Sequence, residues 1–212
     1  MPDTPQTLFD ELAEDYESMR EELAWDPFVH IRDAFKGSLK NLKILDAGCG
    51  TGECCRWFQS QGAKPYGLDI SPEMCFHAAD RSENIPYLNH DLSEPLPFDD
   101  GQFDGVVALG CLEYIEHIED TVREFSRVLK PGGIFLGCFE RFGEDCPNGC
   151  DREVIFFDDW MRYRQNEAEI REMLSRSFEH SELRRVPGFK LTDDEGCETG
   201  ERTQYIRVIA RK

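Results

Sequence analysis

The sequence predicts an α/β protein with a doubly wound, seven-stranded, mainly parallel sheet and N-terminal cap helices. Three observations predict this fold. Apolar runs of strand length alternate with helical segments from residue 42 onward, a glycine-rich turn follows the first run, and acidic residues follow the next two. Such alternation is typical of a parallel sheet that helices cover on both faces. The 212 residues suit a single domain, spanning 1–212, with a sizeable core.

The first 40 residues are expected to form a helical cap. Within residues 4–24, four apolar side chains recur at helical spacing: Leu8, Leu12, Tyr16 and Met19. A second helical stretch follows at 27–37 and ends at Gly37, because glycine is favoured just beyond a helix C-terminus. We therefore expect two helices ahead of the first strand.

Residues 41–140 are expected to hold the first five strands and the helices between them. The strands are predicted at 42–47, 64–70, 85–91, 103–110 and 130–140, and the helices at 53–61, 71–80 and 113–129. Ser71 and Pro72 begin the second of these helices, because serine caps a helix N-terminus and proline fits its first turn.

The rest of the chain is expected to complete the sheet. Residues 141–160 show no regular pattern, and 161–212 hold a C-terminal helix, which begins at about residue 160, and a pair of strands. The strand-like runs at 178–186 and 203–212 are joined by a loop rather than a helix, so we expect them to pair antiparallel. The last strand then runs against the others.

Charge and cysteine content limit the classes of function. The 43 acidic and 24 basic residues give a net charge of −19, and such a surface repels nucleic acid and anionic lipid. No stretch reaches the roughly 20 apolar residues of a membrane span, and the first ten residues do not resemble a secretion signal. The nine cysteines are expected to be reduced and mostly buried, which indicates a cytoplasmic protein. Cys146 and Cys150 have a metal-like spacing, but no second pair accompanies them, so no metal is expected.

The stretch LDAGCGTGECC (Leu45–Cys55) places a glycine-rich turn directly after the first predicted strand. Ligands of an open parallel sheet bind beyond the carboxyl ends of its strands. Glycine at 48, 50 and 52 would let a ligand approach the backbone there and would permit positive φ angles. The dinucleotide fingerprint G-x-G-x-x-G requires glycine where this chain has Glu53. The spacing alone leaves a purely structural turn as the alternative.

Acidic residues follow the next two predicted strands. Asp69 ends the second strand, where its carboxylate can accept hydrogen bonds from both hydroxyls of a ribose. Asp91 follows the third strand, where it can accept from a donor such as an adenine amino group, with Leu92 beside the ring. Helix capping explains any one of these acids, but a nucleoside-containing ligand explains them together.

These motifs resemble the class I S-adenosylmethionine-dependent methyltransferases, which have a Rossmann-like fold. The closest subset is the small-molecule enzymes of the methyltransferase type 11 and ubiquinone/menaquinone-biosynthesis kind. The resemblance covers residues 8–140 and rests on LDAGCGTG, GLDIS, HDLSEPLPFDDGQFDGVV and LEYIEHIEDTVREFSRVLKPGG. It implies S-adenosylmethionine as cofactor, S-adenosylhomocysteine as its product, and residues 41–140 as the cofactor-binding core.

The resemblance implies that ten residues bind the cofactor: Tyr16, Asp46, Gly48, Cys49, Gly50, Asp69, Ile70, Asp91, Leu92 and Leu109. Those between 46 and 50 would line its methionine and ribose side, and Asp69 would bind the ribose hydroxyls. The next three would hold the adenine, and Leu109 would lie near the reacting sulfonium. Tyr16 would close over the methionine part; the alternative is that it only fills its helix face.

The sequence defines the binding site for the methyl acceptor less clearly than the cofactor site. Candidate general bases are Glu113, Tyr114, His117 and His30. His117 is more simply a solvated or capping residue, and Glu113 a carboxylate in the first turn of a helix, so no catalytic residue is assigned. Cys49 and Cys111 are interpreted as buried thiols rather than nucleophiles. Aromatic residues that suit a flat or cationic acceptor, or that simply pack against the sheet, are Phe156, Phe157, Trp160 and Tyr163.

The sequence therefore predicts methyl transfer from S-adenosylmethionine to an O, N, C or S atom of a small-molecule substrate. It predicts no nucleic-acid partner and no membrane span, and it leaves a homodimer open. Three alternatives remain: a non-catalytic cofactor-binding subunit or regulator, a methyltransferase that acts on a protein, and an NAD-dependent oxidoreductase. The last is disfavoured by the residue at 53 and by Asp91.

Overall fold

The computed structural model describes residues 4–22, 26–141, 153–156, 160–192 and 198–212. The helices are α1 (Pro5–Leu12), α2 (Tyr16–Glu22), α3 (Pro27–Ala34), α4 (Glu53–Ser60), α5 (Pro72–Asp80), the 3-10 helix η1 (Leu112–Tyr114), α6 (Ile118–Val128) and α7 (Glu167–Ser175). The strands are β1 (Lys43–Ala47), β2 (Lys64–Asp69), β3 (Tyr87–Asn89), β4 (Phe103–Ala108), β5 (Leu129–Glu140), β6 (Glu153–Phe156), β7 (Trp160–Tyr163), β8 (His180–Thr192) and β9 (Glu198–Arg211).

Seven of the strands form one sheet in the order β3-β2-β1-β4-β5-β9-β8, and β6 and β7 form a separate antiparallel pair. Strands β1 to β5 pair in parallel, whereas β9 is antiparallel to both of its neighbours. This arrangement confirms the predicted fold class, including the antiparallel last strand. The winding direction changes between β1 and β4, and the carboxyl ends of strands at such a switch point are where ligands bind.

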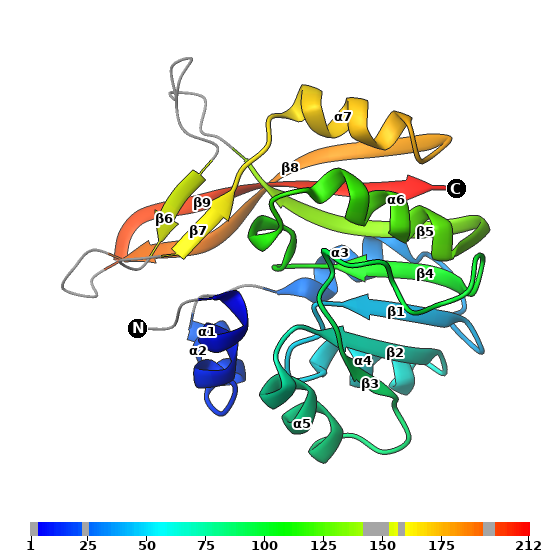
Figure 1. The fold of residues 1–212 in the computed structure, drawn as a ribbon, viewed down its shortest axis with the longest axis horizontal. Helices are drawn as coiled ribbons and strands as arrows, with labels where there is room; N and C mark the ends of the chain where they lie inside the picture. The colour runs from blue at the N-terminus through cyan, green and yellow to red at the C-terminus, as the bar shows by residue number, and fades with distance from the viewer. Residues whose placement is uncertain (1–3, 23–25, 142–152, 157–159, 193–197) are drawn as a thin grey trace.

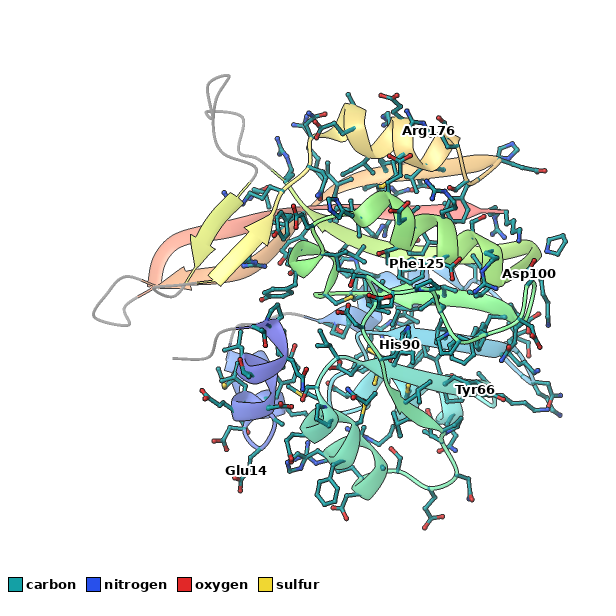
Figure 2. All side chains as sticks on the ribbon, viewed as in Figure 1. Glu14, Tyr66, His90, Asp100, Phe125 and Arg176 are labelled. Atoms are coloured by element: carbon teal, nitrogen blue, oxygen red, sulfur yellow. The ribbon has the colours of Figure 1, made fainter. Side chains whose placement is uncertain are left out.

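Helices cover both faces of the sheet (Figure 1). On one face, α6 and α7 bury apolar side chains that include Val122 and Leu174. Phe125 points from α6 toward the same face (Figure 2) and is fully buried. On the other face, Ile31 of α3 and Phe58 of α4 pack against the sheet. Burial on both faces explains why the parallel strands read as almost continuous apolar runs.

The predicted N-terminal helix is divided into α1 and α2 by residues 13–15. Like charges three or four residues apart oppose a continuous helix at this point, since Asp10, Glu11, Glu14 and Asp15 all lie within it. Helix α3 ends at Ala34, three residues before the predicted end. None of the described helices has the length and apolar character that crossing a membrane requires.

Two later elements differ from the prediction. The helix predicted over 113–129 begins at Ile118, because residues 112–114 form η1 and carry Glu113 into the interior. The helix predicted at 160–177 begins at Glu167, where the side chain of Asn166 caps it. The preceding residues instead form the β6–β7 hairpin, part of which falls in the segment predicted to be irregular. Long-range ion pairs, described below, hold both segments in these conformations.

The cap helices and the β6–β7 hairpin lie at the same end of the sheet. Figure 1 shows α1, α2 and this hairpin beside the edge where β1, β2 and β4 finish. Tyr66 and Asp100 lie toward the opposite end (Figure 2). A ligand at the carboxyl ends of the strands would therefore be enclosed by the cap on one side and the hairpin on the other.

Candidate active site

The glycine-rich turn after β1 depends on three positive φ angles. Gly48, Gly50 and Gly52 have φ values of 73°, 51° and 82°, which side chains with a Cβ rarely adopt. The N–H of Gly48 donates to the carbonyl oxygen of Leu68 at 2.8 Å and ties the turn to β2. A Cβ at position 48 would stand 2.5 Å from the Cβ of Cys111. The turn thus lies directly against the segment that follows β4.

Asp69 connects this turn to the start of α5. Its Oδ2 accepts a hydrogen bond from the N–H of Gly50 at 2.8 Å, and its Oδ1 accepts one from the N–H of Ser71 at 3.0 Å. A carboxylate can accept about four hydrogen bonds, so each oxygen has capacity for one more donor. The side chain is 7% exposed, and burial raises its pKa from 3.8 to about 6, although both N–H groups act to lower it. Asp69 is a fixed acceptor suited to a pair of hydroxyls.

A second buried carboxylate lies next to it on β1. Asp46 is 4% exposed, and its Oδ2 accepts a hydrogen bond from the Sγ of Cys55 at 3.2 Å. Burial raises the pKa of Asp46 to about 7, and the charge of Asp69 contributes to that rise. A cationic group placed beside two such carboxyls would lower both pKa values. The site therefore favours a ligand that carries positive charge.

A row of three aromatic rings runs from the glycine-rich turn to the segment after β4. The ring of Tyr16 approaches to 3.4 Å the point where a Cβ of Gly50 would stand. Tyr16 meets Phe9 edge-on with 6.2 Å between the ring centroids, and Phe9 meets Tyr114 edge-on at 5.3 Å. Tyr16 thus lies where the sequence places it, and its closing over a ligand stays a prediction.

The residues predicted to hold the adenine differ in burial. Asp91 is exposed after β3, and its Oδ1 accepts a hydrogen bond from the N–H of Ser93 at 2.8 Å. Leu92 places its side chain in the core beneath α6. Ile70 and Leu109 are half-buried. The adenine contacts assigned to this region therefore stay predictions.

A buried ionic cluster fills the space between η1, β5, β7 and β9. Arg162 Nη2 lies 2.8 Å from Glu113 Oε1 and 2.9 Å from Glu140 Oε2, and it donates to the Tyr205 hydroxyl at 2.8 Å. Tyr205 in turn donates to Glu113 Oε1 at 2.9 Å. All four residues are at most 3% exposed. The guanidinium also lies over the ring of Tyr114, 5.5 Å from its centroid. The hairpin is thus joined electrostatically to the ends of β4 and β5.

The role of Arg162 was missed by sequence reasoning, and Glu113 was interpreted incorrectly. Glu113 lies in η1, where it pairs with Arg162, and not in the first turn of the long helix predicted at 113–129. A usable signal was present, because Glu113 and Glu140 both follow long apolar runs and would need a buried cation between them. Nothing local in the sequence shows that Arg162 supplies it.

Residues 45–137 match the profile of a family described as a methyltransferase domain. This stretch is therefore similar to a methyltransferase domain. Relatives include the demethylmenaquinone methyltransferase of Tropheryma whipplei, 32% identical over 135 residues that cover 62% of this chain and 56% of the relative. The malonyl-[acyl-carrier protein] O-methyltransferase of Enterobacter lignolyticus is 33% identical over 92 residues, which cover 43% of this chain and 36% of the relative.

The fold is also similar to that of a solved methyltransferase structure. An S-adenosylmethionine-dependent methyltransferase from Mesorhizobium loti has a TM-score of 0.67 at 26% identity, over 87% of this chain and 97% of that one. The chain spans about half the length of the curated relatives it matches. The matched stretch contains Asp46, Asp69 and Glu113, whereas Tyr16 and Arg162 lie outside it. The cap helices and the β6–β7 hairpin therefore lie outside the stretch that the family profile matches.

The residues of the matched stretch would fit S-adenosylmethionine. Asp69 has acceptor capacity for two ribose hydroxyls, and the paired carboxyls suit a sulfonium or ammonium group. Gly110 has a φ of 78°, and a Cβ there would meet nothing within 4 Å, which leaves room for a ligand close to the backbone after β4. His90 Nε2 is buried and has no hydrogen-bond partner among the described residues. Figure 2 shows His90 in the segment after β3, so it is a further candidate for the adenine side.

The other predicted candidates lie elsewhere or are thiols. His117 precedes α6 and is exposed, and His30 is buried on α3, where burial and the charge of Arg207 lower its pKa. Burial raises the pKa of the Cys111 thiol, and a hydrogen bond with Cys75 together with burial raises that of Cys49. Both thiols are therefore neutral near pH 7, as expected of structural cysteines.

Several predictions concern parts of the chain that the structure leaves out. Cys146, Cys150 and Phe157 lie outside the described residues, as do the side chains of Phe156 and Trp160. Among the residues that are described, no three potential ligands come together as a metal site.

Proposed function

We propose that the chain binds S-adenosylmethionine at the carboxyl ends of β1, β2 and β4 and transfers its methyl group to a small molecule. The observation that carries this proposal is the geometry of Asp69. Its two oxygens are held by backbone N–H groups of the glycine-rich turn and of the start of α5, so that they present the remaining lone pairs in fixed directions. The matched family and the buried carboxyl pair support the same ligand.

When bound, S-adenosylmethionine supplies an electrophilic methyl group, so the protein's task is to align the acceptor and to exclude water. The rings of Phe9, Tyr16 and Tyr114 provide an apolar wall for that purpose. Glu113 is the polar group of this wall: Oε1 is held by Arg162 and Tyr205, and Oε2 is buried with no hydrogen-bond donor among the described residues. Glu113 Oε2 is therefore the atom that would accept an N–H or O–H of the acceptor.

The acceptor is proposed to be a small molecule because the relatives that match this chain are named for such substrates or for a carrier-bound acyl group. The chain is also proposed to act as one unit over 1–212, with its small-molecule substrate as partner. Six cysteines in the described part of the chain are free thiols, which supports the cytoplasmic setting expected from the sequence. A protein acceptor or a non-catalytic binding role would appear as cofactor binding without turnover of small metabolites.

Replacing Asp69 by asparagine is expected to weaken binding of S-adenosylhomocysteine roughly 100-fold, because the amide loses the charge and one of the two acceptor oxygens. Isothermal titration calorimetry with S-adenosylhomocysteine, with NAD as a parallel titrant, measures the effect. Asp99→Asn, at an exposed position before β4, is the matched control and is expected to bind like the wild type. Binding of NAD instead of S-adenosylhomocysteine by the wild type would contradict the proposed function.

A further inference from the structure

The cap helices are docked on the glycine-rich turn by one carboxylate. Glu17 Oε1 accepts three hydrogen bonds, from Thr51 Oγ1 at 2.6 Å, Arg56 Nη2 at 2.8 Å and Arg81 Nη1 at 3.0 Å. These donors come from the glycine-rich turn, from α4 and from the end of α5. A single side chain of α2 thus holds three separate elements around the proposed cofactor site.

The residue before this carboxylate is the one that covers the site. Tyr16 lies over Gly50, and its position follows from that of Glu17 because the two residues share the first turn of α2. A second contact fixes the other end of the cap, where the Ser71 hydroxyl donates to Asp10 Oδ1 at 2.5 Å. Rotation or lifting of α2 would break the contacts of Glu17 and remove Tyr16 from the turn together.

The cap helices carry a large negative charge, so their docking depends on the contacts of Glu17. Residues 4–22 hold seven acidic residues and one arginine, in a chain whose net charge is −19. Long-range repulsion therefore opposes docking of the cap, and the guanidinium groups of Arg56 and Arg81 offset it locally. Partial burial raises the pKa of Glu17, but the hydrogen bond from Thr51 and the two arginines outweigh it and hold the pKa below its ordinary value. Glu17 is thus ionised at neutral pH.

We propose that Glu17 is a positioning residue for the cofactor: its contacts with Thr51, Arg56 and Arg81 hold Tyr16 over the bound ligand and must open for the ligand to leave. This inference rests on the proposed function, since the ligand is taken to be S-adenosylmethionine or S-adenosylhomocysteine. It assigns the rate of cofactor exchange to an ion-paired contact whose carboxylate lies outside the stretch that matches the methyltransferase family.

The test is the dissociation rate of S-adenosylhomocysteine, measured by stopped-flow displacement at one fixed KCl concentration. Glu17→Gln keeps the size of the side chain and removes its charge, so dissociation is expected to become roughly tenfold faster. Glu14→Gln makes the same charge change in the same cap, at a side chain that points away from the body of the protein (Figure 2), and is expected to change the rate less than twofold. Arg81→Gln, which removes one of the three donors, is expected to give a smaller increase than Glu17→Gln.

A second arm separates positioning from a general effect on folding. In a Tyr16→Ala background, Glu17→Gln is expected to change the dissociation rate less than twofold, because the side chain that it positions is gone. Equal rates for the Glu17 and Glu14 variants would overturn the inference, and so would a tenfold effect that persists without the tyrosine ring. Failure of the wild type to bind S-adenosylhomocysteine would overturn the proposed function and this inference with it, whereas the other two outcomes leave the proposed function intact.

Discussion

Replacing Arg162 by methionine is expected to lower the free energy of unfolding by about 3–5 kcal/mol. Methionine fills much of the same volume but leaves Glu113 buried without its cation and Glu140 with Arg164 as its remaining ion-pair partner. An uncompensated buried carboxylate costs several kcal/mol, because the interior solvates charge poorly. The Tyr205 hydroxyl also loses its donor. Urea denaturation followed by far-ultraviolet circular dichroism measures the change.

The matched control is Arg171→Met on α7. Its guanidinium lies 2.7 Å from Glu167, as close as the buried pairs, but the arginine side chain is 53% exposed. Surface pairs of this kind contribute about 0–1 kcal/mol, so this variant is expected to stay within that range. In the double variant Arg162→Met with Glu113→Gln, part of the lost stability should return, since the carboxylate that lost its cation is removed. A single Arg162→Met variant as stable as the Arg171 variant would show that the cluster does not stabilise the fold.

This cluster marks the limit of what the sequence predicts. The order of the strands from β1 to β5 is predicted correctly because each is specified locally, by apolar runs, by Ser71 as a cap and by glycines at positive φ. Beyond Glu140 the prediction placed a helix where β7 lies. The strand conformation of β7 depends on its pairing with β6. The buried position of Arg162 depends on Glu113 and Glu140, which lie 49 and 22 residues earlier in the chain. No local pattern encodes such contacts.

The same distinction applies to the candidate site: residues placed by sheet order could be predicted, and residues placed by long-range contacts could not. Asp46, Gly48, Gly50 and Asp69 come together because they sit at the ends of adjacent strands, which is a consequence of sheet order and so could be predicted. Glu17 was not predicted, although its neighbour Tyr16 was, because its three donors become neighbours only when the cap folds onto α4 and α5. The sequence thus predicts how the cofactor side is built and much less of what encloses it.

Replacing Asp46 by asparagine is expected to stabilise the protein at pH 8 by about 2–4 kcal/mol while weakening cofactor binding. The folded-state pKa of about 7 lies above the ordinary value of 3.8, so the native state keeps a proton that the unfolded chain releases. The free energy of unfolding therefore falls as pH rises from about 4 to 7 and stays low above that, by an amount on the order of 4 kcal/mol. Asparagine removes this loss and can still accept the hydrogen bond from Cys55. The gain should become small near pH 4, where the unfolded chain also begins to hold the proton.

Asp104→Asn provides a control of opposite sign. Although burial raises the pKa of Asp104, Lys130 and the N–H of Lys43 outweigh it and lower the pKa, so its carboxylate stabilises the fold above the ordinary pKa and loses that contribution as pH falls. The Asp104 variant should be less stable than the wild type at pH 8, where the Asp46 variant is more stable. Urea denaturation between pH 4 and 8 and titration with S-adenosylhomocysteine measure both properties on the same samples. Lower stability of the Asp46 variant at pH 8 would show that the wild-type carboxylate is favourably solvated in the native state. A gain in stability coupled to a loss of binding would instead show that the protein keeps an unfavourable buried charge because a cationic ligand neutralises it.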